Sequence, residues 1–427
     1  MSETETQTET QTETETTPGF ADFGLGPKLL RGIEAAGFVE PRPIQVHTIP
    51  AALEGRDVLG LAQTGTGKTA AFALPILERL LANRAAGPRA LIVAPTRELA
   101  AQIEMEIRSL ARFTNLKTVT IFGGISPKKQ IAALRHNPEI VVGCPGRLLD
   151  LKEQGELHLN RIETLVLDEA DHMFDMGFLP DIRRILAALP KERQNLLFSA
   201  TMPREIRGLA KKVLRQPHTV DLNHSRPVDT IEHALYPVDS GKKLELLRHV
   251  MGEDGFASAI VFTRTKHRAR RIARQLADSG HAAVALQGNM SQNARERAMQ
   301  GFRDRKFNVL VATDIAARGI DVERVSHVIN FDMPGTVDAY THRIGRTGRS
   351  ECEGKGYTFV TNDDVALVQA VEYKIGESIP RRSVEGIAEL ELTGVRSAKP
   401  RPTGRQRPAN RASRPPRARR PRAHRAS

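Results

Sequence analysis

A glycine-rich segment near the start of the chain carries residue types that bind phosphate. Residues 62–69 read Ala-Gln-Thr-Gly-Thr-Gly-Lys-Thr, directly after an apolar run and before a helical pattern. Glycines let backbone N–H groups approach phosphates, and the N-terminus of a helix favours an anion. Lys68 would then reach the β- and γ-phosphates, and Thr69 would hold Mg²⁺. The strict P-loop pattern asks for Gly where Ala62 stands, and every other position matches it. The segment therefore predicts a nucleoside triphosphate site.

Two carboxylates follow a second apolar run about a hundred residues downstream. Residues 165–171 read Leu-Val-Leu-Asp-Glu-Ala-Asp, which predicts a buried strand that ends in acidic side chains. Asp168 is placed to bind Mg²⁺ through water, and Glu169 to orient and deprotonate the attacking water. An acidic strand end alone is more often a solvated loop. Together with the P-loop upstream, it indicates a nucleotide hydrolase.

A third segment, residues 340–349, places three arginines at a spacing of three. Arg343, Arg346 and Arg349 can share one helical face at this spacing. An arginine delivered to a γ-phosphate stabilises the charge of the transition state. For this segment alone, a solvated basic face is an equally good interpretation.

The composition of the chain narrows the class of protein. Its 427 residues include 63 Lys and Arg against 50 Asp and Glu, a net charge of +13. Residues 396–427 hold twelve of the basic residues and no acid, whereas residues 1–17 hold five glutamates. This balance points to a polyanionic partner. The two cysteines, Cys144 and Cys352, exclude a disulfide scaffold and a cysteine-rich zinc site.

Both ends of the chain are low-complexity tracts that we expect to be disordered. No apolar run approaches a membrane span of about 18 residues, and the glutamate-rich start does not resemble a secretory or transit signal. We therefore expect a cytoplasmic protein without a membrane partner. We expect the basic tail to be a sequence-independent tether for that polyanion, with a merely solubilising tail as the alternative.

The remaining sequence must form the elements that position these residues. Short Val/Ile/Leu runs alternate with helix-length segments, which indicates parallel sheets covered on both faces. The expected strands are residues 57–62, 89–95, 117–122, 139–144, 164–169, 194–201 and 218–222, then 259–263, 283–286, 309–313, 327–331 and 356–361. A polar stretch separates the two sets, so we predict two α/β domains in tandem. Ligands of such sheets bind at the carboxyl ends of the strands, where nearly every motif falls.

These motifs, in this order, resemble those of the DEAD-box RNA helicases, most closely the bacterial RhlE-like group. Residues 168–171 spell the name of that family, and the resemblance covers roughly residues 18–380. It implies two RecA-like domains that bind ATP and RNA across a cleft. The implied organisation is a disordered tail (1–17), the ATP-binding domain (18–222), a linker (223–232), the C-terminal helicase domain (233–380), a short extension (381–395) and a basic tail (396–427).

The resemblance assigns the ATP site residue by residue. Phe20 would stack on adenine, and Gln45 would read its hydrogen-bonding edge, which favours ATP over GTP. Arg346 and Arg349 would be arginine fingers, with Lys68 and Glu169 as the other catalytic residues. The remaining nucleotide-binding residues would be Thr64, Gly65, Thr66, Gly67, Thr69, Gly319 and Asp321, and Mg²⁺ would lie at Thr69 and Asp168.

The resemblance also assigns RNA and coupling residues. Ser199, Thr201 and His342 would couple hydrolysis to domain closure, the two hydroxyls by bridging to the acidic motif. The RNA backbone would contact Pro95, Thr96, Arg97, Gly124, Arg147, Arg264, Arg295 and Thr313. Taken singly, several of these are as readily turn or cap residues. The implied partner is RNA bound through its backbone, with ribosome precursors or the RNA-decay machinery as candidate contexts and a monomer as the expected state.

Three positions depart from the family pattern. Arg42 replaces the usual Thr of the adenine-binding motif and either alters adenine recognition or lies exposed. Cys144 replaces a Thr, and because a thiol is a weak donor, one RNA contact is in doubt. Gln287 stands where His is common, with no consequence that we can derive. The function predicted is an ATP-dependent RNA helicase; the alternatives are an ATP-timed RNA clamp or annealing protein, and a DNA helicase.

Overall fold

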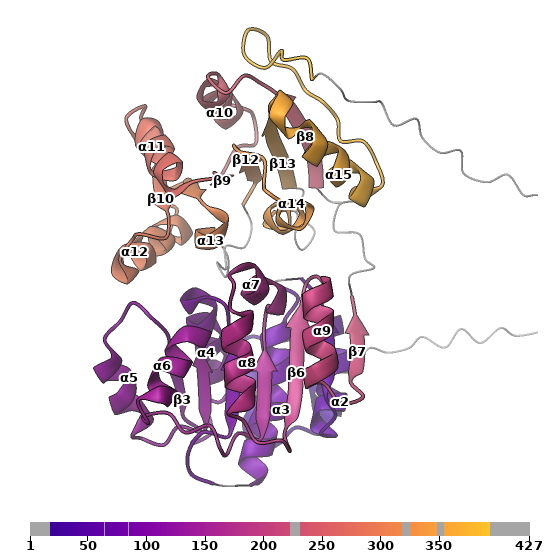
Figure 1. Ribbon diagram of the computed structural model, residues 1–427, viewed down its shortest axis with the longest axis vertical. Coiled ribbons are helices and arrows are strands. Elements are labelled where there is room, and N and C mark those ends of the chain that lie inside the picture. The colour runs from indigo at the N-terminus through magenta and orange to yellow at the C-terminus, as the bar shows by residue number, and fades with distance from the viewer. Residues whose placement is uncertain are drawn as a thin grey trace, which may run out of the picture.

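The computed structural model describes residues 18–63, 65–83, 85–222, 231–317, 325–347 and 354–392. Within these residues the chain forms two α/β domains, stacked one above the other in Figure 1. Each is built on a wholly parallel sheet, as the sequence predicted. The two tails predicted to be disordered lie outside the described residues. No helix of the described residues is both long and apolar enough to span a membrane.

Seven strands form the sheet of the first domain, in the order β3-β4-β2-β5-β6-β1-β7. They are β1 (Val58–Leu61), β2 (Ala90–Val93), β3 (Thr118–Ile121), β4 (Ile140–Gly143), β5 (Thr164–Leu167), β6 (Gln194–Ser199) and β7 (His218–Asp221). Each lies inside a predicted range. The central strands β2, β4, β5 and β6 are buried along their whole length, because helices cover both faces of the sheet.

The helices of the first domain fall into two layers. One core forms between the sheet and η1 (Phe20–Phe23), α1 (Pro27–Ala35), α2 (Pro43–Leu53), α3 (Lys68–Ala82) and α4 (Arg97–Leu110). The opposite core forms with α5 (Pro127–Leu134), α6 (Pro145–Glu153), α7 (Ala170–Asp175), α8 (Leu179–Ala187) and α9 (Arg204–Val213). Helices α5 to α9 cover the face nearer the viewer in Figure 1.

The second domain has a six-stranded sheet in the order β10-β11-β9-β12-β13-β8. Its strands are β8 (Ile231–Pro237), β9 (Ala259–Phe262), β10 (Ala283–Leu286), β11 (Val309–Ala312), β12 (His327–Asn330) and β13 (Gly354–Val360). One face packs on α10 (Lys243–Met251) and α11 (Lys266–Ala277). The other packs on α12 (Gln292–Arg303), α13 (Asp314–Ala317), α14 (Val337–Ile344) and α15 (Val365–Ile375), with η2 (Asn362–Asp364) preceding α15.

Strand β8 is absent from the sequence prediction. It begins at Ile231, inside the predicted linker, and pairs with β13 at the edge of the sheet. Its burial is uneven: Glu232 is exposed and His233 half-buried, whereas the next three residues are buried. An edge strand of this mixed composition lacks the continuous apolar run by which the other strands are recognised.

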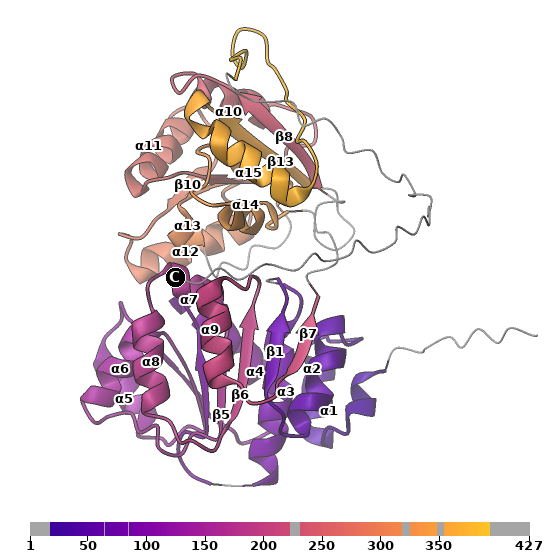
Figure 2. The same cartoon turned by 45° about the vertical axis from the view of Figure 1, so that its right-hand side comes forward.

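The two sheets point the carboxyl ends of their strands toward each other. In Figures 1 and 2, α7 of the first domain lies directly below α13 and α14 of the second. The loops that follow β1, β5 and β6 therefore face the loops that follow β11 and β12. This arrangement brings the sequence motifs of both domains to a single boundary.

Candidate functional site

The phosphate-binding loop has the backbone form that the sequence predicted. Gly65 and Gly67 have φ values of 84° and 91°, in the region that favours glycine. The amine of Lys68 is buried and donates to the carbonyl of Ala62 at 3.1 Å. The departure at Ala62 is therefore tolerated, because the backbone rather than the side chain of that residue holds the lysine.

Gln45 and Arg42 tie helix α2 to this loop. The Gln45 side chain accepts the N–H of Arg42 at 2.9 Å and donates to the carbonyl of Gly67 at 3.0 Å. The guanidinium of Arg42 donates to the carbonyl of Gly65. Adenine recognition by Gln45 would require these internal bonds to be exchanged, so that role stays a prediction. Arg42 is exposed, which was one of the two outcomes expected for this departure. Its hydrogen bond to Gly65 also supports the phosphate-binding loop.

Phe20 lies in the core of the first domain. Its ring is 6% exposed and makes edge-to-face contacts with Phe23 and Phe38, with ring centroids 6.1 and 6.0 Å apart. This packing fixes the position of the ring within the core. Stacking of Phe20 on adenine also stays a prediction.

Asp168 follows β5 as a fully buried carboxylate. Burial raises its pKa to about 6; Lys68, with its amine 4.0 Å away, acts against that rise, and the nearby charge of Glu169 adds to it. The buried, incompletely neutralised Asp168 carboxylate and the hydroxyl of Thr69, which follows Lys68 in α3, are the hard oxygen donors that Mg²⁺ prefers. The residues present therefore fit the predicted metal.

Glu169 is held in an unusual conformation by a histidine that the sequence analysis missed. Its φ of 52° is in the left-handed region, a rare conformation for a residue with a side chain. His172 Nδ1 lies 2.8 Å from Glu169 Oε2, and both side chains are buried. Burial alone would raise the pKa of Glu169, but the charge and hydrogen bond of His172 hold it well below its ordinary value. Glu169 is thus an ionised carboxylate, as a general base must be.

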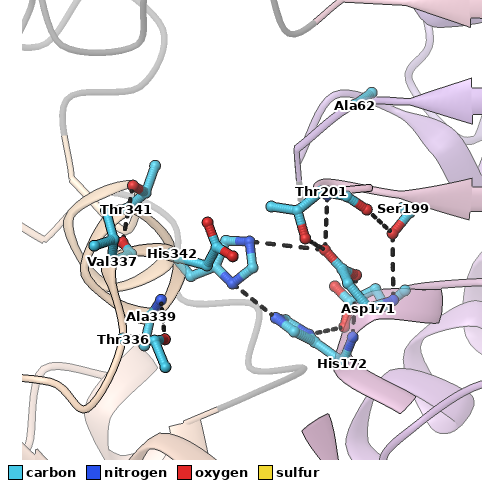
Figure 3. Close-up of polar contacts among 12 residues, drawn as sticks. Ala62, Asp171, His172, Ser199, Thr201, Thr336, Val337, Ala339, Thr341 and His342 are labelled. Atoms are coloured by element: carbon cyan, nitrogen blue, oxygen red, sulfur yellow. Dashed lines mark hydrogen bonds and ion pairs between the residues drawn. The ribbon is translucent and has the colours of Figure 1, made fainter. Parts of the chain in front are cut away.

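The acidic motif and the strand β6 are joined by hydroxyl groups. Asp171 Oδ2 accepts the backbone N–H and the hydroxyl of Thr201 at 2.8 and 2.9 Å. The Ser199 hydroxyl accepts the N–H of Asp171 at 3.2 Å. The predicted bridge between these hydroxyls and the acidic motif is confirmed, and Figure 3 shows it on the right. The predicted role of this bridge in coupling stays a prediction.

His342 of the second domain reaches across to this network. Its Nδ1 lies 3.2 Å from Nε2 of His172, and its Nε2 lies 3.9 Å from Asp171 Oδ2. The two imidazole rings meet edge to face, with centroids 4.9 Å apart (Figure 3). Burial and the neighbouring His172 lower the pKa of His342 to about 4. One imidazole from each domain therefore belongs to a single hydrogen-bonded chain that ends at Glu169.

A small pocket at the domain boundary gathers the predicted catalytic groups. Lys68 and Glu169 line it from the first domain, and His342 and Arg346 line it from the second. The positive charge of Arg346 also contributes to the lowered pKa of Glu169. The structure thus brings three of the four predicted catalytic residues together; Arg349 lies outside the described residues.

The prediction that three arginines share one helical face is wrong. Helix α14 ends at Ile344, so Arg346 lies in the turn beyond it. Arg343 is buried instead: its guanidinium donates to both carboxylate oxygens of Asp314 at 2.6 and 2.7 Å and to the side-chain oxygen of Asn330. Arg343 is therefore a structural residue, and its regular spacing from Arg346 does not reflect a common role.

Predicted RNA contacts of the first domain converge on one loop. Arg97, at the start of α4, packs so closely on Gly124 that a Cβ there would lie 2.2 Å from its Nη1. Arg147, at the start of α6, donates to the carbonyl of Ile125 at 3.4 Å. Thr96 caps α4 by accepting the N–H of Leu99, and Pro95, buried, precedes it. Two guanidinium groups and two helix N-termini thus surround the loop after β3.

The predicted RNA residues of the second domain differ in their exposure to solvent. Arg264 lies beyond β9 with its side chain 66% exposed, and Thr313 follows β11 at the domain boundary. Arg295 is buried, and its Nε donates to Glu98 of the first domain at 2.6 Å. In this structure Arg295 therefore joins the two domains rather than facing solvent.

The other departures have local explanations. Cys144 precedes α6 without capping it through its side chain, and burial raises the pKa of its thiol to about 12, so the group is neutral. Gln287 is buried and accepts the N–H of Asn289 at 2.8 Å. Thr64, Gly319 and Asp321 lie outside the described residues.

Known protein families match both domains that contribute to this site. A family model described as DEAD/DEAH box helicase matches residues 42–209, and one described as Helicase conserved C-terminal domain matches residues 242–351. The chain is 43% identical over 370 residues to ATP-dependent RNA helicase RhlB of Pseudomonas syringae pv. tomato, covering 84% of this chain and 93% of that protein. It is 42% identical over 354 residues to the DEAD-box ATP-dependent RNA helicase CshA of Geobacillus kaustophilus, covering 83% and 76%.

A solved structure shares the arrangement of both domains. Dbp5 of S. cerevisiae bound to RNA and ADP BeF3 superposes with a TM-score of 0.77 at 34% identity, over 86% of this chain and 95% of that one. Because the score covers both domains together, it reflects their relative placement as well as the fold of each.

Proposed function

The chain belongs to the DEAD/DEAH box helicase family and is an ATP-dependent RNA helicase, and from that premise we propose how its residues divide the work. The two RecA-like domains close on ATP at one side of their boundary and on the RNA backbone at the other. Closure completes the ATP site and grips one RNA strand, which destabilises a short duplex locally. Hydrolysis then permits reopening and release.

The observation that carries this proposal is the histidine contact across the domain boundary. The imidazole nitrogens of His172 and His342 lie 3.2 Å apart, and His172 also contacts the general base Glu169 at 2.8 Å. Any movement of the second domain therefore changes the environment of the residue that activates water. Together with the bridge from Asp171 to Thr201, this contact supports the assignment of His342, Ser199 and Thr201 to coupling.

In the proposed reaction the first domain binds the nucleotide and accepts a proton. Lys68 neutralises the β- and γ-phosphates, and the backbone N–H groups of residues 65–69 bind their oxygens. Thr69 and Asp168 would hold Mg²⁺, which when bound neutralises charge on the phosphates. Glu169, kept ionised by His172, takes the proton of the attacking water.

The second domain contributes the charge that the transition state needs. Arg346 lines the same pocket as Glu169 and Lys68, and a guanidinium there can stabilise charge that develops on the γ-phosphate. We assign Arg349, Gly319 and Asp321 to the same half of the site from the family motifs. The isolated first domain, which lacks these groups, should have almost no RNA-stimulated hydrolysis.

RNA binding in this proposal depends on the backbone of the strand. Arg97 and Arg147 converge on the loop after β3, and Arg264 extends from the second domain. Arginines pair with phosphates irrespective of sequence, and contacts to 2′-hydroxyls distinguish RNA from DNA. From the resemblance alone we further propose a monomeric, cytoplasmic, RhlE-like enzyme that acts on ribosome precursors or in RNA decay.

The test is strand separation of a short RNA duplex by the full chain. We expect separation that requires ATP, and ATPase activity that RNA stimulates and DNA of the same sequence does not. The Lys68→Ala protein serves as a matched control, because it should retain the fold but lose nucleotide binding. Annealing without ATP, in the absence of ATP-dependent separation, would refute the proposal.

A further inference from the structure

Helix α11 of the second domain presents a stripe of positive charge to solvent. Its exposed residues include His267, Arg270, Arg271 and Arg274, which occupy positions i, i+3, i+4 and i+7 of one helical face. The opposite face, with Ala269, Ile272, Ala273 and Leu276, is buried against the sheet. We call His267, Arg270, Arg271 and Arg274 the basic stripe.

The stability of the helix does not explain this charge. The first turn of α11 carries Lys266 and Arg268 and no acidic residue, although the N-terminus of a helix disfavours positive charge. Like charges at i and i+4, such as Arg270 and Arg274, also repel one another. Arg274 in the last turn is favourably placed, but the charge in the first part of the helix opposes its formation.

Neighbouring acids leave the centre of the basic stripe uncompensated. Among the described residues, Arg270 and Arg271 form no ion pair; Arg274 pairs with Asp278 at 3.7 Å, and its side chain is 82% exposed. Arg268, beside the basic stripe, forms an ion pair with the buried Asp332 and is therefore not counted among the groups that could bind an anion. At least two guanidinium groups are thus free to bind an anion.

The basic stripe continues the RNA-binding side of the molecule. Arg264, a predicted RNA contact, lies two residues before α11 begins at Lys266. In Figures 1 and 2, α11 lies on the same side of the upper domain as α5 and α6 on the lower one. Since Arg147 lies in the first turn of α6, helix α11 is on the same flank of the molecule as the predicted RNA contacts of the first domain.

We propose that the basic stripe is an accessory RNA-binding surface that holds the strand beyond the segment gripped in the cleft. The ligand is the sugar-phosphate backbone of flanking RNA, bound without regard to sequence. The eight residues from His267 to Arg274 span about 10 Å of helix, so the stripe can contact a few consecutive phosphates. This inference rests on the proposed function, because it extends the RNA path that the function requires.

The chemistry of the stripe favours RNA over a protein partner. Its exposed positions are arginines and a histidine, with no exposed aromatic or aliphatic side chain among them. Protein interfaces usually bury an apolar centre, whereas affinity for nucleic acid comes largely from the release of counterions from the backbone. An acidic protein is therefore the less favoured ligand, and measurement of RNA binding distinguishes it from RNA.

The experiment compares RNA binding by the full chain and by the variant Arg270→Gln/Arg271→Gln/Arg274→Gln. Glutamine has a helix propensity close to that of arginine, so α11 should remain folded. Binding is measured over a salt series with an RNA that only fills the cleft and with the same RNA extended by a single-stranded flank. For the extended RNA, we expect the log-affinity versus log-salt slope to decrease by about 2, at ~0.7 for each lost phosphate contact. For the short RNA the slope should not change.

Two further variants complete the design. Arg204→Gln/Arg207→Gln/Lys211→Gln removes the same charge from the exposed face of α9 and should leave both slopes at their original values. Replacement of the three α11 arginines by lysine should retain the original slope, because only charge is required.

The proposal is overturned if the glutamine variant binds the extended RNA as the original chain does. That result would favour an acidic protein as the ligand of the basic stripe. It is also overturned if both RNAs lose affinity equally, or if the α9 variant has the same effect. If the original chain shows no RNA-stimulated ATPase with the short RNA, the proposed function fails instead.

Discussion

The two domains have similar folds but divide the site unequally. In the first domain, the chemically important side chains are buried and hold one another: Lys68 contacts Ala62, Glu169 contacts His172, and Asp171 contacts Thr201. The second domain contributes few groups to that pocket, principally His342 and Arg346, and they contact it only across the boundary. The first half is therefore organised for binding and proton transfer, whereas the second half can act only when the domains meet.

This division explains how RNA can control hydrolysis. The proposed RNA contacts lie on both domains, as do the groups around the proposed ATP site, so a strand that draws the domains together would also complete the pocket. The ion pair between Glu98 and Arg295, at 2.6 Å, is a second contact across the boundary, on the side of the predicted RNA path. The comparison predicts that loss of a second-domain group at the pocket lowers turnover alone, whereas loss of Lys68 in the first domain lowers binding of the nucleotide itself.

The largest effect is expected for Arg346→Ala. Loss of an arginine finger lowers turnover by a factor on the order of 10³ to 10⁵, while ATP affinity should change little because the charge acts in the transition state. Steady-state ATPase assays with saturating RNA measure both quantities. Arg343→Ala is the matched control: because it breaks a buried ion pair, it should lower the thermal midpoint, which Arg346→Ala should not. Equal losses of turnover and ATP affinity in Arg346→Ala would contradict the assignment.

A somewhat smaller loss is expected for Glu169→Gln in the first domain. General-base catalysis typically contributes on the order of 10² to 10⁴ in rate, and glutamine keeps the size and a hydrogen bond to His172. The variant should bind ATP and RNA and accumulate as a closed complex. Single-turnover hydrolysis and equilibrium nucleotide binding separate the two steps, with Lys68→Ala as a contrast that loses binding itself. Near-normal hydrolysis by Glu169→Gln would exclude Glu169 as the base.

His172→Leu should have an intermediate effect at the junction of the two domains. Removal of the ring frees the Glu169 carboxylate and breaks the contact with His342, and misplacement of a catalytic group can cost on the order of tenfold to a hundredfold in rate. We expect kcat to fall without a change in KM for ATP. His172→Gln, whose amide can still donate to Glu169, should recover part of the loss. If both variants behave like the original chain, His172 only fills space.

The sequence was sufficient to predict most of the fold and the local parts of the site. Buried parallel strands consist of continuous apolar runs, and the residues of the phosphate-binding loop are contiguous. Both can therefore be recognised from the sequence alone. The order of the motifs then identified the remaining positions by resemblance. Edge strand β8 was missed because Glu232 and His233 interrupt its apolar residues, which shortens the run by which a strand is recognised.

The contacts that depend on tertiary placement could not be predicted. Arg343 and Arg346 have the same residue type and regular spacing, yet only the fold decides that Arg343 pairs with Asp314 and that α14 ends before Arg346. His172 gave no signal as an isolated histidine. Its separation of three residues from Glu169, at the start of a helix, was the one clue that the two side chains could meet.

The smallest effect concerns stability rather than catalysis, and it should appear in the second domain. Burial lowers the pKa of His233 and of His327 to about 4, and one ring nitrogen of each has no hydrogen-bond partner among the described residues. Because the unfolded chain has the ordinary histidine pKa near 6.5, it binds more protons than the folded chain between pH 6.5 and 4, so stability is lost as the pH falls through this window. For His233 the loss at pH 5 should be on the order of 2 kcal/mol. Denaturant titrations of the full chain at pH 7 and pH 5, followed by a probe in each domain, measure this loss. The His233→Gln/His327→Gln variant should show a weaker pH dependence, and an unchanged dependence would mean that other groups cause the acid sensitivity.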